Sequence, residues 1–432
     1  MQKLRATLAK PRLAKAIVCL FFTCFLLVGL LTAADYGQPW DELDEMDILR
    51  MNLWEYARAL HADESAFEAW AQPNGLSLNR LTPISQSVER DHGVSAFYPI
   101  AGAALSQALP ANARQLVWHL WCWALFTLGA YALYACCRQL GLSRFFSLLA
   151  ALMLFLSPRF FAEGHYNNKD VVLTSLVLCV LWQALRLMKK PTFSGALWFV
   201  FFGALAANTK LAGLALWGLC ALMVLVAQIV KKRLRGRVLG VGCAALGGFL
   251  VFYAALTPAL WRDPTGFLAY LTKNAMAFSR WENYIRFRGV TFDTQFTPVP
   301  WYYLPYMMLA TTPLWALLLA AVGQLSALPV LCGRGVGKHR EQALPLLLVS
   351  LLWALPLGFA LATRTTVYNG WRHFYFLYGP LLALAAWGAS WLWARLCRMR
   401  PRWLRRAFAV MMALCMAFTG VGIAVNHPYQ YA

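Results

Sequence analysis

Acidic residues gather in one short part of this chain. Positions 35–91 hold 12 of the 18 acidic residues, although the whole chain carries a formal net charge of +21. A carboxylate can serve as a general base or can bind a divalent metal ion. We predict Asp41 and Glu42 as catalytic residues and Asp44 and Glu45 as candidate metal ligands, although their spacing is not diagnostic of a metal. The alternative for Asp41 is that it only caps the helix that follows.

Three further polar clusters, Glu163–Asp170, Asn208–Lys210 and Tyr368–His373, interrupt long apolar stretches. A lysine in apolar surroundings is costly unless it meets an anion or a water-filled cavity. Asp170 is a third candidate catalytic residue, with capping of the next helix as its alternative. The predicted substrate-binding residues, drawn from these clusters and from the first loop, are Lys210, Arg372, His373, Asn168, Lys169 and Tyr98.

Carboxylates that face cations at a membrane edge suit the transfer of a sugar from a polyprenyl phosphate. The leaving phosphate needs cations to stabilise its developing charge, a role we predict for Lys210 and Arg372. The acceptor hydroxyl needs one base, and a carboxylate can supply it. Attack opposite the leaving phosphate would invert the anomeric carbon.

The composition predicts the elements that carry these residues. The chain has 432 residues, of which 60% are hydrophobic and 13% charged, which is typical of an all-α polytopic membrane protein. A span needs about 20 apolar residues to cross roughly 30 Å of hydrocarbon. The two shortest runs, 143–158 and 194–208, predict kinked or broken helices beside a cavity. We predict about 11 spans, at 16–34, 114–137, 143–158, 170–187, 194–208, 211–230, 237–258, 302–331, 342–362, 374–394 and 405–425.

Basic residues predict the orientation. With the N-terminus in the cytoplasm, the inner segments hold 24 of the 39 basic residues, which is the positive-inside pattern. The basic runs at 231–233 and 398–406 are therefore read as topology anchors and not as nucleic-acid patches, and no nucleic-acid partner is expected. The first span is too long for a cleaved signal peptide, so we predict an uncleaved anchor. The acidic loop and all three polar clusters then share the extracytoplasmic face of a bacterial inner membrane.

We predict a single membrane domain over 1–432 with two large outer loops, 35–113 and 259–301. Loop 35–113 contains apolar residues at helical spacing from Leu43 onward, and a second amphipathic stretch at 97–109. Both are expected to lie on the membrane surface. Loop 259–301 mixes basic and aromatic residues, which suits lipid phosphates and sugar rings but equally an ordinary interfacial belt. All 11 cysteines fall in or beside spans, so neither a disulfide framework nor a thiolate metal site is expected.

In these motifs the chain resembles the GT-C superfamily of lipid-linked-sugar glycosyltransferases, in its bacterial protein-mannosyltransferase and aminoarabinose-transferase-like branch. Trp40-Asp41-Glu42 matches the Asp-Glu motif of that family, whose aspartate is regarded as the base. Asn168-Lys169-Asp170 corresponds to a second acidic position, Thr209-Lys210 is similar to a pair that contacts the lipid phosphate, and Arg372-His373-Phe374 is similar to a motif that opens a late span. The resemblance implies a GT-C-type bundle and a polyprenyl-phosphate sugar donor.

The chain also departs from that family. Asn426–Ala432 resembles a segment that normally leads into more chain, so we expect no separate soluble C-terminal domain. The rival functions are a transporter or lipid-linked-sugar flippase, and a membrane-embedded assembly partner. Transporters usually keep charges near the midplane and often show internal repeats, whereas these charges cluster at one rim. The sequence identifies neither the sugar nor the acceptor, which could be a glycan, a lipid or a protein, and it does not identify the oligomeric state.

Overall fold

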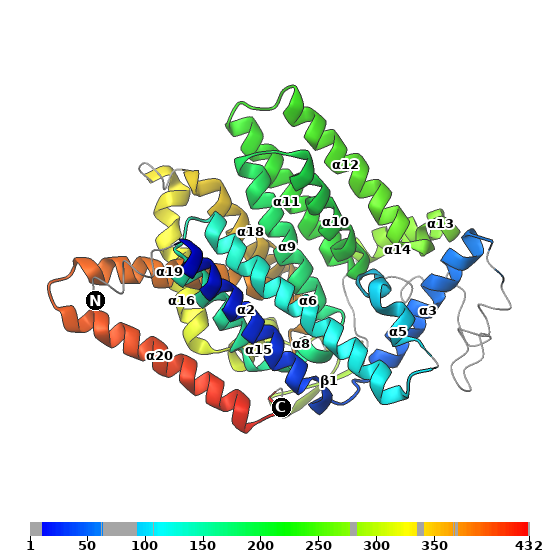
Figure 1. Ribbon diagram of the computed structural model, residues 1–432, viewed down its shortest axis with the longest axis horizontal. Helices are drawn as coiled ribbons and strands as arrows, with labels where there is room; N and C mark the ends of the chain where they lie inside the picture. Colours follow the sequence, from blue (N-terminus) through cyan, green and yellow to red (C-terminus); the bar gives the residue numbers. More distant parts are fainter. Residues whose placement is uncertain are drawn as a thin grey trace.

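The computed structural model describes residues 11–61, 63, 93–106, 108–276, 283–334, 341–365, 367 and 370–430, which form a bundle of helices (Figure 1). The α-helices are α2 (Pro11–Thr32), α3 (Glu42–Ala59), α5 (Ala101–Ala104), α6 (Ala111–Gln139), α7 (Arg144–Phe155), α8 (Pro158–Tyr166), α9 (Asp170–Lys189), α10 (Phe193–Thr209), α11 (Leu211–Val230), α12 (Arg237–Leu256), α13 (Pro258–Arg262), α14 (Pro264–Met276), α15 (Tyr303–Thr311), α16 (Leu314–Pro329), α18 (Ala343–Ala362), α19 (Tyr378–Arg398) and α20 (Arg402–Val425). The shorter elements are the 3-10 helices η1 (Ala33–Asp35), η4 (Ser95–Ile100) and η6 (Arg372–Leu377), the π-helix η5 (Val330–Arg334), and the strands β1 (Tyr284–Phe287) and β2 (Val290–Asp293).

The helices confirm an all-α polytopic membrane protein. Among the described residues, nine helices are long and apolar enough to cross a membrane. Helices α7 and α8 meet at a bend of 71° and would make a tenth span, which confirms the broken helix predicted near 143–158. Helix α10 is shorter, with 17 residues. The single span predicted over 302–331 is wrong, because Pro313 lacks an N–H and separates α15 from α16.

The most buried helix is α9. Most of its residues are buried, whereas α12 and α20 expose most of theirs, so α9 forms the centre and the latter two form the lipid-facing rim. Helices α16 and α19 pack along each other at a close crossing. A Cβ on Gly323 would collide with the carbonyl of Leu384, and one on Gly388 with the carbonyl of Leu319. Small residues allow this approach, as is common in membrane helix pairs.

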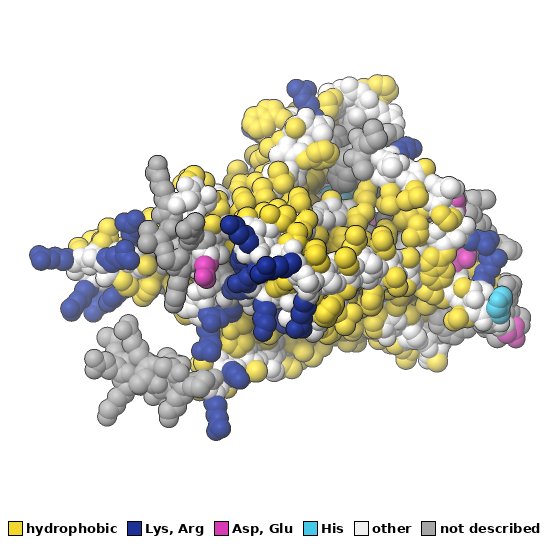
Figure 2. Space-filling view, turned by 90° about the horizontal axis from the view of Figure 1, so that it is seen from above, with side chains coloured by type: hydrophobic (Ala, Val, Ile, Leu, Met, Phe, Trp, Pro, Cys, Tyr) yellow, Lys and Arg dark blue, Asp and Glu magenta, His cyan; other side chains and the backbone are white. Residues whose placement is uncertain are grey.

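One end of the bundle gathers basic side chains. Lys189 donates to the carbonyl of Gln139 at the end of α6, and Lys231 donates to the carbonyl of Met188 at the end of α9. On the visible face in Figure 2, the main group of Lys and Arg side chains lies toward the left end, and hydrophobic side chains cover much of the remainder. The segments predicted to be cytoplasmic at 138–144, 186–193 and 231–237 therefore lie together.

The first loop is only partly as predicted. Helix α3 confirms the amphipathic helix expected from Leu43, and it buries Met46 and Leu49. The surface helix predicted over 97–109 is wrong. Phe97 is fully buried and stacks on Trp118 at 4.2 Å, and the segment forms only η4 and the single turn α5.

The second loop contains α13, α14 and a feature that we did not predict, the antiparallel hairpin β1–β2. Phe287 of β1 is buried and packs edge-on against Tyr303 at 5.0 Å, so this aromatic serves the core and not an interfacial belt. Arg288, in the turn, lies over the ring of Tyr306 at 5.9 Å. The basic and aromatic residues at 278–281 lie outside the described residues.

Candidate active site

Asp41 stands at the N-cap position of α3 but does not cap the helix through its side chain. The carboxylate is instead 51% exposed, and Asp41 Oδ2 accepts a hydrogen bond from Arg372 Nη2 at 3.1 Å. The geometry therefore favours a role for this side chain other than capping the helix. Its carboxylate is both reachable from solvent and paired with a cation from a distant part of the chain.

Arg372 connects Asp41 to a second acidic position. Its Nε lies 3.8 Å from Asp170 Oδ2, and the other Asp170 oxygen pairs with Lys210 Nζ. Lys210 Nζ also lies 3.3 Å from His373 Nδ1. The structure thus brings five of the predicted residues into one continuous polar network, which runs from Asp41 through Arg372 and Asp170 to Lys210 and His373.

Each of these side chains is positioned by a helix end. Asp170 is the first residue of α9, so it lies past the N-cap position, and its N–H donates to Asn167 Oδ1 at 2.7 Å. Lys210 occupies the one extended residue between α10 and α11. Arg372 and His373 open η6. The backbone breaks between helices therefore turn all of these side chains toward one another.

Lys210 is only 22% exposed and Asp170 only 5%. Burial lowers the pKa of the Lys210 ammonium below its usual value, although Asp170 beside it opposes part of that shift. A partly buried cation whose pKa is lowered, paired with a specific carboxylate, is a candidate functional group.

A second ion pair lies beside this network. Lys169 Nζ pairs with Glu45 Oε1 on α3, and Asn168 next to it is buried. Burial works against the charge of Lys169, but Glu45, Asp170 and Asp41 outweigh it and raise the pKa of its ammonium. Gly93 packs on this lysine with φ +118, a conformation that favours glycine. Glu45 thus holds Lys169 beside the network, and no contact that the structure gives joins Asn168 to it among the described residues.

Glu42 faces a different partner. Its side chain is fully buried, and Glu42 Oε2 lies 2.9 Å from Nε2 of His119 in α6. This placement favours a role in anchoring α3 over contact with a substrate. Asp44 is exposed, and within the described part of the chain no three His, Cys, Asp or Glu side chains group as metal ligands would.

Tyr98 does not join the network through the contacts that the structure gives it. Its hydroxyl donates to the carbonyl of Leu256 at 3.1 Å and contacts Asn52 Oδ1 at 3.4 Å, so it links η4 to α3 and α12.

Asn208 has a similar linking role. Its Oδ1 accepts from the N–H groups of Gly93 and Ser95 at 3.3 and 3.1 Å. Of the cluster 368–373, residues 368 and 369 lie outside the described residues.

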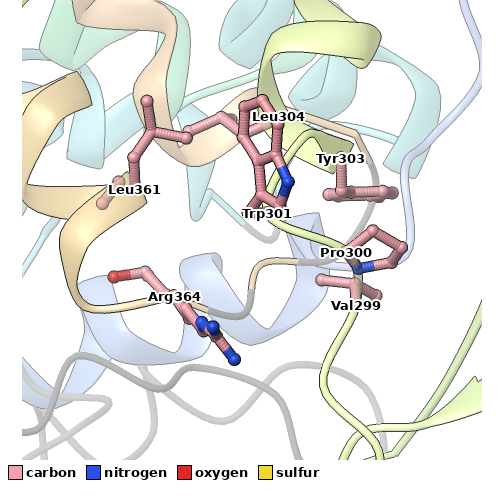
Figure 3. A pocket seen from close by; sticks show the side chains of 9 residues that line it. Val299, Pro300, Trp301, Tyr303, Leu304, Leu361 and Arg364 are labelled. Carbon is pink, nitrogen blue, oxygen red and sulfur yellow. The ribbon is translucent and has the colours of Figure 1, made fainter.

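A separate pocket lies between residues 299–304 and the end of α18. Figure 3 shows Arg364 across from Trp301 and Pro300, with Tyr303 on the same side as Pro300. Tyr303 connects the pocket to the turn before η6, because its hydroxyl accepts from the N–H of Gly370 at 3.2 Å. The pocket thus adjoins the segment that carries Arg372 but does not contain the carboxylates.

No protein-family model matches the chain, and no curated protein matches it in sequence. Two crystal structures of ArnT from Cupriavidus metallidurans match it in three dimensions. The apo structure is 15% identical with a TM-score of 0.51, and the match covers 97% of this chain and 74% of that chain. The structure bound to undecaprenyl phosphate is 16% identical with a TM-score of 0.48, and the match covers 96% and 73%.

The fold is therefore that of an all-α polytopic membrane protein. Within that class it has the ArnT-like fold, as the sequence motifs predicted.

Sequence reasoning missed three features of the site. It did not foresee that Glu45 pairs with Lys169, that His119 faces Glu42, or that Glu163 lies in a buried hydrogen-bond network. The available signal was a histidine and an acid inside strongly apolar stretches, since such groups need partners. Their partners could not be read from the sequence.

Proposed function

We propose that the protein is an inverting glycosyltransferase. It moves a sugar from a polyprenyl-phosphate donor to an acceptor hydroxyl at the extracytoplasmic face of the bacterial inner membrane. The observation that carries this proposal is the network in which Arg372 lies 3.1 Å from Asp41 and 3.8 Å from Asp170, with Lys210 paired to Asp170. A candidate base and two candidate phosphate ligands share one site.

Lys210 and Arg372 bind the donor phosphate in this proposal. Without donor, the cations Lys169, Lys210 and Arg372 are offset by Asp41, Glu45 and Asp170. A phosphate that reaches Arg372 competes with Asp41, which is the most exposed of these carboxylates. Binding of the donor therefore releases the Asp41 carboxylate from its arginine, and the released oxygen can accept a hydrogen bond from the acceptor hydroxyl.

Asp41 then accepts the proton of the acceptor hydroxyl. The hydroxyl oxygen forms a bond to the anomeric carbon, and the bond from that carbon to the phosphate oxygen breaks. Its electron pair stays on the phosphate, which leaves as polyprenyl phosphate next to Arg372 and Lys210. Since attack comes from the face opposite the leaving group, the anomeric configuration inverts. Glu42 and Asp170 hold Asp41 and the cations in place, and any divalent metal would need ligands beyond Asp44 and Glu45.

The charge of the bundle supports the proposed orientation. The ends of α6, α9 and α11 carry Arg138, Lys189 and Lys231, which fits the cytoplasmic side. The site residues belong to the opposite ends of the same helices, because Asp170 opens α9 and Lys210 precedes α11. The N-terminus is cytoplasmic and the site extracytoplasmic in this arrangement.

The test is turnover by the purified protein. Wild type with a polyprenyl-phosphate sugar should release polyprenyl phosphate and label an acceptor, and Asp41→Asn should stop the release while folding normally. A transporter or flippase would instead move the lipid-linked sugar across vesicles without covalent change. Mass spectra of surface glycans from a deletion strain would identify the acceptor class.

A further inference from the structure

A buried carboxylate that the proposed reaction does not use lies in α8. Glu163 is 3% exposed and accepts three hydrogen bonds. Arg159 Nε and Tyr375 Oη donate to Oε1 at 2.9 and 2.5 Å, and Asn167 Nδ2 donates to Oε2 at 2.5 Å. Both oxygens are satisfied, and a satisfied buried network of this kind rigidifies the groups that it joins.

The first branch of the network leads to Asp170. Asn167 donates to Glu163 through its Nδ2, and its Oδ1 accepts from the N–H of Asp170 at 2.7 Å. Glu163 therefore holds the side chain that accepts the first N–H of α9. Asp170 in turn pairs with Lys210, so this branch ends at one of the proposed phosphate ligands.

The second branch leads to Arg372. Tyr375 belongs to η6, the same short helix as Arg372 and His373. Its side chain is fully buried, and its ring packs against Phe160 of α8 at 4.7 Å. The hydroxyl of Tyr375 therefore ties η6 to α8 at a point one turn from Arg372.

From these two branches we propose that Glu163 is a positioning residue that sets the distance between Asp170 and Arg372. This inference rests on the proposed function, since it concerns the two sides of the proposed phosphate site. One carboxylate holds the start of α9 through Asn167 and holds η6 through Tyr375. The two branches end at the same ion pair, in which Arg372 Nε lies 3.8 Å from Asp170 Oδ2.

A merely structural role for the network would stabilise the fold without affecting ligand affinity. The chain offers a matched control for this difference. Tyr378 lies three positions after Tyr375, is also fully buried, and has a hydroxyl 2.6 Å from Ser157 Oγ. Tyr375→Phe and Tyr378→Phe each remove one buried hydroxyl, but only the first removes a contact with Glu163. Both changes are smaller than Glu163→Gln, which leaves Arg159 buried beside a neutral group.

The experiment measures the binding of a short-chain polyprenyl phosphate to the full-length protein in detergent, together with the unfolding temperature. Tyr375→Phe should bind the lipid phosphate with a Kd about fivefold higher than wild type, because it loses one buried hydrogen bond that positions the site. The Kd of Tyr378→Phe should stay within about twofold of wild type. In an Arg372→Ala background, Tyr375→Phe should change the Kd by about twofold at most, because the two residues then no longer act through a common contact.

Each outcome discriminates. If wild type binds the lipid phosphate but both tyrosine variants bind like wild type, or both lose affinity equally, the positioning role of Glu163 is refuted and the proposed function stands. If wild type does not bind the lipid phosphate, the proposed function fails and the inference fails with it.

Discussion

Asp41 and Arg372 are 331 positions apart in the sequence, and Asp41 Oδ2 lies 3.1 Å from Arg372 Nη2 in the structure. The contact joins the start of α3 to η6. Because Arg372 also faces Asp170, one guanidinium links the proposed base to the proposed phosphate site. The reaction proposed for this protein depends on that link, and so do the first two predictions.

Asp41→Asn should lower kcat by about 10²- to 10⁴-fold, since an amide cannot accept the proton of the acceptor. The measurement is release of polyprenyl phosphate at saturating donor. Asp44→Asn is the matched control, because Asp44 is an exposed acid on the same helix. Equal losses in the two variants would show that the acidic surface acts as a whole and that Asp41 has no special role.

Lys210→Ala and Arg372→Ala should each lower kcat/KM, and the fall should correspond to about 2–4 kcal/mol of lost transition-state stabilisation. Each change removes a cation that stabilises the departing phosphate. Arg364→Ala serves as the control, since Arg364 lines the separate pocket of Figure 3. Near-normal kinetics in both site variants would remove these two residues from the phosphate site.

Donor affinity should decline at alkaline pH. The protonated form of Lys210 binds phosphate, and burial lowers its pKa, so binding is present at neutral pH and is lost as the pH rises. The loss should begin below the ordinary lysine pKa of about 10.4. A plot of donor KM against pH should show this loss as a rise in KM on the alkaline side. Lys210→Arg should move it to higher pH, because a guanidinium keeps its proton. An unchanged rise in KM in Lys210→Arg would assign the titration to another group.

His119→Ala should destabilise the protein by on the order of 3 kcal/mol, because it leaves the fully buried Glu42 without its nearest partner. Unfolding in mixed micelles measures the change. Arg58→Ala is the comparison, since its ion pair with Glu55 is partly exposed and should contribute below about 1 kcal/mol. Equal stabilities would mean that Glu42 does not depend on His119.

Gly388→Leu should lower the unfolding temperature, because any Cβ at this position collides with the carbonyl of Leu319 and forces α16 away from α19. Gly358→Leu is the matched control within α18, where a Cβ meets no atom within 4 Å. Overpacking a tight contact typically costs about 1–3 kcal/mol, whereas the control should stay near wild type. The same thermal shift for both variants would contradict the close crossing.

The sequence by itself determined the class of fold and much of the list of site residues. Apolar runs of about 20 residues specify spans without reference to any other part of the chain. Lys210 could be singled out because a charge between two apolar runs is expensive wherever it lies. The acidic loop, Asp170, Arg372 and His373 stood out in the same way, by residue type against a local background.

Only the tertiary structure decided which acid meets which base. Successive residues of a helix point in directions about 100° apart. Asp41 and Glu45, one turn apart, therefore lie on one side of α3 and meet Arg372 and Lys169. Glu42 points to another side and meets His119. Likewise, the sequence predicted a surface helix over 97–109, but Phe97 is buried and stacks on Trp118. Pairings of this kind depend on contacts between distant segments, and those contacts exist only once the helices have packed.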